Sequence, residues 1–337
     1  MIRKSMSGNH KPFLLKPSTK DYLWGGRRLY NEFNKEVETP TVAETWECST
    51  HPDGPSRIMS GEYEGLTLTE LLENHPEFLG SNVDPKKEFP VLIKFIDAKE
   101  DLSIQVHPDD DYAMKHEQGQ LGKTEMWYVV DADKEAKLIH GFQHTLTKDE
   151  LRTSIEKGDV ERYLRKVKIE KDDVFFMEAG TVHAIGSGAL ILEVQENSNL
   201  TYRMYDYQRT DKHGQMRELH VEKALEVVDL HVKKEPKQPI RMLQYSPGIG
   251  REFLCRCKHF QVKRYLLNTE HTRDMAEVQI GEHSFKVLVC MSGCGIIFSG
   301  ENDKDSLRFC KGDCIFVPAM EGAIRLHGKA KLLGVNC

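Results

Sequence analysis

Long apolar runs are missing from this sequence. No segment approaches the roughly 20 consecutive apolar residues that a membrane-spanning helix needs. The first residues, 1–11, are polar and basic and lack the apolar stretch of a secretory signal peptide. These two absences predict a cytoplasmic protein with no membrane partner.

A concentrated block of basic residues is missing as well. The 337 residues include 47 Lys and Arg against 53 Asp and Glu, which gives a net charge of −6. Proteins that bind nucleic acid usually carry a strongly basic surface, so we expect no nucleic-acid partner. In a mildly acidic chain, a phosphate-binding site would have to gather its own Lys or Arg side chains.

The eight cysteines give little sign of disulfide bonding, because a chain without an export signal meets a reducing environment. Cys290 with Cys294 and Cys310 with Cys314 form two C-x3-C pairs, which together could hold a structural zinc ion. This spacing is wider than that of the usual zinc knuckle, and both pairs lie in apolar runs typical of strands. We therefore expect ordinary thiols at these positions.

Short β-rich runs bounded by Gly, Pro or Asp make up most of the sequence. The clearest are 91–96, 126–130, 173–177, 190–194 and 201–205, and further runs follow between 260 and 335. Capping boxes at Thr67–Glu70 and Thr147–Glu150, and helical spacing over 218–230, predict a few helices among them. The pattern predicts a mainly β protein built on barrels with inserted helices.

An internal echo indicates that there are two barrels. The segment KDDVFFMEA at 171–179 resembles KGDCIFVPA at 311–319, but only the first continues to a histidine, His183. The charged, Pro-bearing segment 231–239 is a candidate linker. We therefore place a metal-binding catalytic domain with helical insertions at 1–235, and a smaller C-terminal barrel without metal ligands at 236–337.

Candidate metal ligands come from three places. Ser103, Gln105 and His107 alternate with apolar residues, so in a strand they share one face, which either lines a cavity or meets solvent. Glu125 begins an apolar strand, and His183 follows a Gly-Thr-Val turn. Two imidazoles, a carboxylate and an amide suit zinc, with iron or manganese also feasible.

These motifs, in this order, resemble the type I mannose-6-phosphate isomerases in their short bacterial form, which belong to the cupin superfamily. The resemblance covers nearly the whole chain and includes WGG at 24–26, ETWE at 44–47, HPDGP at 51–55, KFIDA at 94–98, QVHP at 105–108 and YRMYD at 202–206. It implies two cupin-type, jelly-roll barrels. It also implies an aldose–ketose isomerase that interconverts mannose 6-phosphate and fructose 6-phosphate through a cis-enediol.

The resemblance further implies a role for particular residues. One zinc ion per chain would be held by Gln105, His107, Glu125 and His183. The phosphosugar would meet Ser103 and Lys123, and the catalytic residues would be Arg203 and Glu193. Further candidates for binding the substrate are Arg209 and Lys212 on the following loop. The proton-transferring base stays open between Glu193 and a histidine such as His51, and the chain could be a monomer or a homodimer.

Two other functions stay open. The same ligands could hold iron in a dioxygenase, although a glutamine ligand and the cations Lys123 and Arg203 favour a phosphosugar. A non-catalytic sugar-phosphate-binding cupin could keep the metal but would have no need of Arg203 or Glu193. Because both are present, the isomerase is the favoured interpretation.

Overall fold

The computed structural model describes residues 10–36, 39, 41–210, 214–233, 235–272, 274–300 and 303–337. Contacts divide the chain into two compact units. The site unit, which contains all the predicted site residues, consists of Pro17–Pro55 and Val91–Ile240. The C-terminal unit consists of Met1–Lys16, Ser56–Pro90 and Arg241–Cys337. Our domains at 1–235 and 236–337 stay a prediction. They differ from this division by assigning the two N-terminal segments of the C-terminal unit to the catalytic domain.

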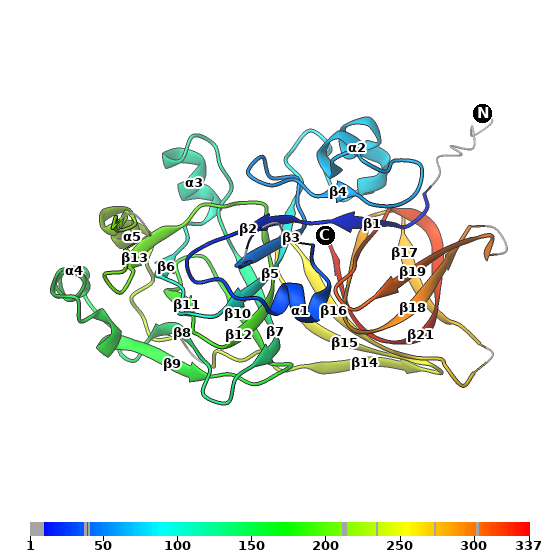
Figure 1. The fold of residues 1–337 in the computed structure, drawn as a ribbon. Coiled ribbons are helices and arrows are strands. Elements are labelled where there is room, and N and C mark those ends of the chain that lie inside the picture. The colour runs from blue at the N-terminus through cyan, green and yellow to red at the C-terminus, as the bar shows by residue number, and fades with distance from the viewer. Residues whose placement is uncertain are drawn as a thin grey trace. The chain divides into compact units, whose positions relative to one another are not determined.

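Two antiparallel sheets build the site unit (Figure 1). The first has the strand order β10-β7-β12-β5-β3-β2, with bounds β2 (Ser18–Lys20), β3 (Glu44–Cys48), β5 (Val91–Ala98), β7 (Glu125–Ala132), β10 (Val174–Met177) and β12 (Ala189–Glu196). The second has the order β13-β6-β11-β8-β9, with bounds β6 (Ile104–Val106), β8 (Lys137–Phe142), β9 (Leu164–Lys168), β11 (His183–Ile185) and β13 (Tyr202–Tyr205). The strands predicted at 91–96, 126–130, 173–177, 190–194 and 201–205 are confirmed as β5, β7, β10, β12 and β13.

The apolar core of the site unit lies between these two sheets. Ile96 and Trp127 of the first sheet and Leu138 and Ile185 of the second belong to one buried cluster. Such a face-to-face arrangement leaves the outer face of each sheet to be covered by something else. In the second sheet, Ile104 points outward into a different cluster. Gln105, its neighbour in the strand, therefore faces the interior of the unit.

Helices cover that outer face. α4 (Lys148–Lys157) and α5 (Val221–Val227) contribute buried side chains to the outer cluster. Thr147 caps α4 through the predicted capping box, and Thr67 caps α2 (Leu68–Asn74) in the same way. The remaining helical segments are α1 (Arg28–Phe33), α3 (Asp110–His116), η1 (Pro76–Leu79) and η2 (Val160–Tyr163). No helix in the described part of the chain combines the length and the apolar character needed to cross a membrane.

The C-terminal unit is one ten-stranded sheet. Its main order is β14-β15-β16-β21-β18-β20-β1-β4, with β17 paired to β21 and β19 paired to β18. The bounds are β1 (Phe13–Lys16), β4 (Arg57–Ile58), β14 (Arg241–Ser246), β15 (Ile249–Arg256), β16 (Gln261–Asn268), β17 (Ala276–Gly281), β18 (Lys286–Ser299), β19 (Asp305–Cys310), β20 (Cys314–Val317) and β21 (Met320–Asn336). The further short runs predicted between 260 and 335 include parts of β18 and β21, which are single long strands in the structure.

The internal echo is visible in the backbone. Asp172 and Gly312 occupy equivalent positions, with φ of 74° and 97°, and each precedes an aspartate that begins the approach to β10 or β20. The Asp173 carboxylate accepts from the Glu170 amide at 2.8 Å, and the Asp313 carboxylate accepts from the Cys310 amide at 2.7 Å. The same turn therefore recurs in both units, and Asp172 tolerates the left-handed conformation that Gly312 adopts without strain.

Candidate metal centre and substrate cavity

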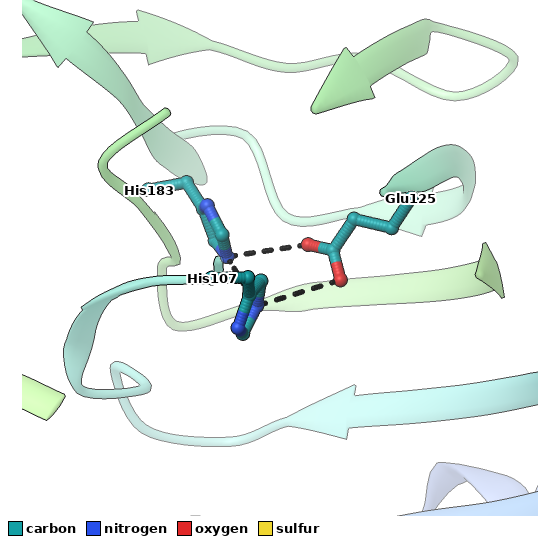
Figure 2. Close-up of side chains that lie close together, drawn as sticks. All are labelled: His107, Glu125 and His183. Carbon is teal, nitrogen blue, oxygen red and sulfur yellow. Dashed lines mark hydrogen bonds and ion pairs between the residues drawn. The ribbon is translucent and has the colours of Figure 1, made fainter. Parts of the chain in front are cut away.

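Two histidines and one glutamate converge between the two sheets of the site unit. His107 follows β6, His183 begins β11 and Glu125 begins β7, so each side chain leaves a strand end. All three are buried, and their ligand atoms lie within 4.8 Å of one another. Figure 2 shows the Glu125 carboxylate facing both rings from one side; the carboxylate lies 3.2 Å from His183 Nε2 and 3.6 Å from His107 Nε2. Three of the four predicted metal ligands therefore meet at one point.

The hydrogen bonds of the two rings fix where their protons lie. His107 Nδ1 is 2.9 Å from the Leu200 carbonyl, and His183 Nδ1 is 2.8 Å from the Thr181 carbonyl. A carbonyl oxygen can only accept, so both Nδ1 atoms carry the proton and both Nε2 atoms present a lone pair. Those Nε2 atoms face each other at 3.1 Å. Burial lowers the pKa of His107 well below its usual value and that of His183 to about 3, which keeps both rings neutral.

Glu125 adds a third acceptor to this group. Its Oε1 is buried and has no hydrogen-bond partner, and it faces the unprotonated His183 Nε2. Burial and the nearby charge of Glu193 raise the pKa of Glu125 to about 7. The Lys123 ammonium reaches His107 Nε2 and Glu125 Oε2, but Glu125 Oε1 is left without a donor, and burying it beside the two Nε2 atoms is costly unless a cation lies there. The donor set and its outward Nδ1–H bonds fit a metal ion of the zinc type.

Gln105 extends the group toward the cavity. Its side-chain amide lies 3.4 Å from His183 Nε2, so the fourth predicted ligand joins the other three. Gln105 is directly opposite His183 in the β11–β6 pair and opposite Arg203 in the β13–β6 pair. Directly opposed residues share a face of a sheet, so the guanidinium of Arg203 is on the same side as the metal cluster.

A cavity of about 260 Å³ adjoins the cluster. Its lining includes Ser103, Gln105, Lys123, Glu193 and Arg203 from the predicted site, and Tyr22, Trp24, Glu44, Lys94, Ile96, Leu102, Ile185, Asn199, Thr201 and Arg217 from elsewhere in the site unit. Four of these residues are Lys or Arg and two are Glu, which leaves an excess of two positive charges. The cavity is therefore cationic inside a chain of net charge −6 and suits an anionic ligand.

Arg203 carries an unused donor in this cavity. Its Nη1 donates to the Glu218 carbonyl at 2.9 Å, but its buried Nε has no hydrogen-bond partner. Burial and the neighbouring Arg217 lower the pKa of Arg203. A guanidinium does not lose its proton in proteins, so the buried N–H remains a fixed positive donor that a ligand oxygen could satisfy.

Glu193 is held between a tryptophan and two lysines. The Trp127 indole donates to Glu193 Oε2 at 3.0 Å, while Oε1 lies 3.6 Å from the Lys94 ammonium and 3.7 Å from that of Lys123. Burial alone would raise the pKa of Glu193, but the two ammonium groups outweigh it and hold the pKa below its usual value. Its Oε1 has no hydrogen-bond partner, so an ionised carboxylate oxygen faces the cavity.

Lys123 joins the metal cluster to the cavity. Its ammonium donates to Glu125 Oε2 at 2.5 Å and lies 3.1 Å from His107 Nε2. The surrounding carboxylates raise its pKa in spite of full burial, so the ammonium stays charged. Ser103, two strand residues before Gln105, lines the same cavity and is buried. The solvent-facing alternative for this polar stripe is therefore wrong.

Asp206 organises the arginines beside the cavity. Its carboxylate accepts from Arg217 at 2.8 and 2.6 Å and from Arg209 at 2.6 Å. Arg217 lines the cavity, whereas Arg209 does not and instead donates to the Asp101 carbonyl. Arg203 makes no such bond to Asp206. The role of Arg209 as a substrate ligand stays a prediction, and Lys212 lies outside the described residues.

The sequence did not predict Arg217 or Glu44 as cavity residues. Arg217 lies 14 positions after Arg203 in an irregular segment, and only its pairing with Asp206 brings it to the cavity. Glu44 lines the cavity as well; it is buried and accepts from the Trp46 indole at 2.7 Å. The alternative base His51 lies beside Asp53 at 3.6 Å and does not line the cavity.

Two antiparallel sheets packed face to face, with a buried His–Glu–His centre beside a cationic cavity, define the chain as a cupin-type protein with a candidate metal site. Residues 13–144 match the model of the phosphomannose isomerase type I catalytic domain. The chain is 38% identical over 323 residues to the mannose-6-phosphate isomerase ManA of Bacillus subtilis, covering 96% of this chain and 98% of that protein. The mannose-6-phosphate isomerase of Streptococcus mutans is 42% identical over 220 residues, which cover 65% of this chain and 68% of that protein.

Solved structures agree with this result. The crystal structure of the Bacillus subtilis mannose 6-phosphate isomerase is 37% identical, with a TM-score of 0.87 over 96% of this chain and 99% of that one. A phosphomannose isomerase of Salmonella typhimurium, at 18% identity and a TM-score of 0.75, covers 96% of this chain and 98% of its own and shows the fold alone. The chain belongs to the type I phosphomannose isomerase family. The predicted mainly β, cupin-type fold and the resemblance are thereby confirmed.

Proposed function

We propose that this protein interconverts mannose 6-phosphate and fructose 6-phosphate; the names of its relatives state that they are mannose-6-phosphate isomerases. The observation that carries the proposal is the meeting of three buried acceptors, His107 Nε2, His183 Nε2 and Glu125 Oε1, at the edge of a cationic cavity. The three acceptor atoms suit a divalent cation. The cavity suits an anionic, hydroxyl-rich ligand.

We further propose that the cation is zinc, one per chain, held by His107, Glu125, His183 and Gln105. Two neutral imidazoles and a carboxylate are common zinc ligands, and redox chemistry is not needed for an isomerisation. A bound zinc ion supplies Lewis acidity, which stabilises negative charge that develops on the sugar oxygens. The carbonyls of Leu200 and Thr181 hold the rings in the tautomer that this requires.

The remaining groups orient the sugar and move its proton. Arg203 places a fixed positive charge, with a free Nε–H, where negative charge develops during the reaction. Glu193 is kept ionised by Lys94 and Lys123, so its open oxygen can accept the proton that leaves one sugar carbon and return it to the next. A single base that removes the proton and returns it on the same face of the sugar is consistent with a cis-enediol intermediate.

We assign the phosphate group to the part of the cavity where Arg217 lies. Arg217 is held rigidly by its two bonds to Asp206, which reduces the conformational entropy lost on binding an anion. Remote phosphate binding contributes energy for orienting the reacting carbons. Ser103 and Lys123, which we propose to contact the phosphosugar, also line the cavity, and the Lys123 ammonium donates to Glu125 of the metal cluster.

The test is an assay of purified protein with mannose 6-phosphate, following fructose 6-phosphate directly by NMR. We expect conversion in both directions, and none with free mannose at equal concentration, because the phosphate contributes to binding. Absence of conversion with zinc-loaded protein would overturn the function. The cytoplasmic location and the monomeric or homodimeric state stay predictions.

A further inference from the structure

Two exposed cysteines lie side by side in the C-terminal unit. Cys294 in β18 is directly opposite Cys310 in β19, in an antiparallel pairing that runs unbroken from Cys294 to Ser299 (Figure 1 shows the two strands). Both side chains are exposed, whereas Ile297 and Phe309 point into the buried core of the unit. The alternation of the strands therefore places both thiols on the outer face of the sheet.

The register satisfies the geometry of a disulfide. Directly opposed residues of antiparallel strands have Cα atoms about 4.5–5.5 Å apart, inside the roughly 4.4–6.8 Å that disulfides span. The Cys310 thiol is also within hydrogen-bonding reach of the Cys294 thiol. No cysteine among the residues that the structure describes belongs to a group of three or more clustered His, Cys, Asp or Glu ligands. The structural zinc site considered from the C-x3-C spacing is therefore not formed.

Lysine residues lie beside Cys294 on the side opposite Cys310. Lys329 of β21 is directly opposite Cys294, so Cys310, Cys294 and Lys329 form one row across three strands. Cys294, Lys329 and Lys331 line a groove of about 490 Å³. A thiol in an exposed groove with ammonium groups beside it is accessible to a small anionic disulfide, whose carboxylates those groups would attract.

The other cysteines differ in this respect. Cys48, Cys255, Cys290 and Cys314 are buried, and burial raises the pKa of Cys255 and of Cys290 to about 12. Buried, protonated thiols exchange slowly with disulfides. Cys257 and Cys337 are half-buried and close enough to interact, so they form the natural comparison pair.

We propose that Cys294 and Cys310 form a redox-active dithiol that is oxidised by low-molecular-weight disulfides of the glutathione type. The Cys294 sulfur attacks one sulfur of the oxidant, and the other leaves as a free thiol, which gives a mixed disulfide on Cys294. The Cys310 sulfur then attacks Cys294, and the second small thiol leaves. The two cysteines lose two electrons and two protons, and the oxidant is reduced to two thiols.

The order of attack follows from the surroundings. Partial burial and the neighbouring Cys294 thiol raise the pKa of Cys310, whereas Cys294 opens into the groove beside Lys329. Cys294 is therefore the entry point and Cys310 the resolving thiol. The inference concerns the C-terminal unit and does not rest on the proposed function.

The test exposes the folded, full-length protein to glutathione disulfide and follows its intact mass, with peptide mapping after alkylation. We expect the loss of two hydrogen masses and a cross-linked Cys294–Cys310 peptide, both reversed by dithiothreitol. The Cys310→Ser variant should stop at the mixed disulfide, with one glutathione retained on Cys294. The Cys294→Ser variant should acquire neither the cross-link nor that adduct. Cys257→Ser, the matched control, should behave as the parent protein.

Several outcomes would overturn the proposal. One is a folded protein whose mass does not change while the urea-unfolded chain reacts. Another is a cross-link between Cys257 and Cys337 in place of the proposed one. A third is a glutathione adduct that persists on the parent protein without resolution, because the two sulfurs would then not meet in the folded sheet.

Discussion

Arg203 lies directly opposite Gln105 in the pairing of β13 with β6, and Gln105 lies directly opposite His183 in the pairing of β11 with β6. One short strand thus connects Arg203, whose Nε–H has no partner, to the candidate metal centre. Because opposed residues share a face, a sugar oxygen near the metal ligands is also within the field of Arg203.

The first prediction concerns Arg203. Arg203→Ala should lower kcat/KM for mannose 6-phosphate by about 10²–10³-fold, because a fixed donor is lost where charge develops. Bound zinc should be unchanged, since Arg203 is not a ligand. The measurement is the initial rate together with metal content, and Arg162→Ala on an exposed turn of the same unit is the matched control. An unaltered rate would remove Arg203 from the reaction.

The second prediction concerns the ligands. His183→Ala should abolish zinc binding and reduce turnover to background, because only two strong ligands remain. His144→Gln, an exposed histidine of the same unit, should retain both properties. Metal analysis after gel filtration and the rate assay check this. Retention of one tightly held zinc per chain in His183→Ala would place the metal elsewhere.

The third prediction concerns pH. Trp127→Phe removes the indole donor that favours the ionised form of Glu193, so the pKa of Glu193 should rise. Glu193 would then become protonated at a higher pH. The acidic limb of the pH profile of kcat/KM should therefore move to higher pH. A pH–rate profile separates this from a loss of packing, which would lower the rate at every pH. An acidic limb that stays in place would argue against Glu193 as the base.

The fourth prediction concerns stability in the C-terminal unit. Lys286 is buried in β18, and burial together with Lys263 lowers its pKa to about 8. The folded state thus releases this proton near pH 8, whereas the unfolded state keeps it until about pH 10.4, so stability should rise with pH across that window. Lys286→Met should stabilise the unit by about 1–3 kcal/mol at pH 7 and by less at higher pH.

Urea unfolding at pH 7, 9 and 10 tests the stability prediction, with the exposed Lys304→Met as its control. The control should leave the unfolding midpoint unchanged at each pH. Equal stabilisation by Lys286→Met at every pH would show that the ammonium is not buried in the charged form.

Local patterns predicted much of the site unit. Alternation placed Gln105 and Ile104 on opposite faces of one strand without deciding which face lies inside, and the capping box placed the start of α4 at Thr147. These features depend on neighbours in the sequence, where propensity and side-chain period act directly. The convergence of His107, Glu125 and His183 came from resemblance to a family, because spacing alone does not determine which strand ends meet.

Long-range pairing accounts for what was missed. β1 and β4 lie near the N-terminus but pair within the C-terminal unit, β1 with β20. No local pattern in Phe13–Lys16 shows that partner, because strand pairing depends on tertiary context. Arg217 was missed for the same reason: its place at the cavity is set by the Asp206 carboxylate and not by its own neighbours.

The most direct measurement is a zinc titration of chelator-treated protein, in which bound zinc and mannose 6-phosphate turnover are followed in one sample. The account predicts that both rise together and level off at one zinc per chain. Full turnover in protein without bound metal, or zinc that binds without restoring any rate, would contradict it.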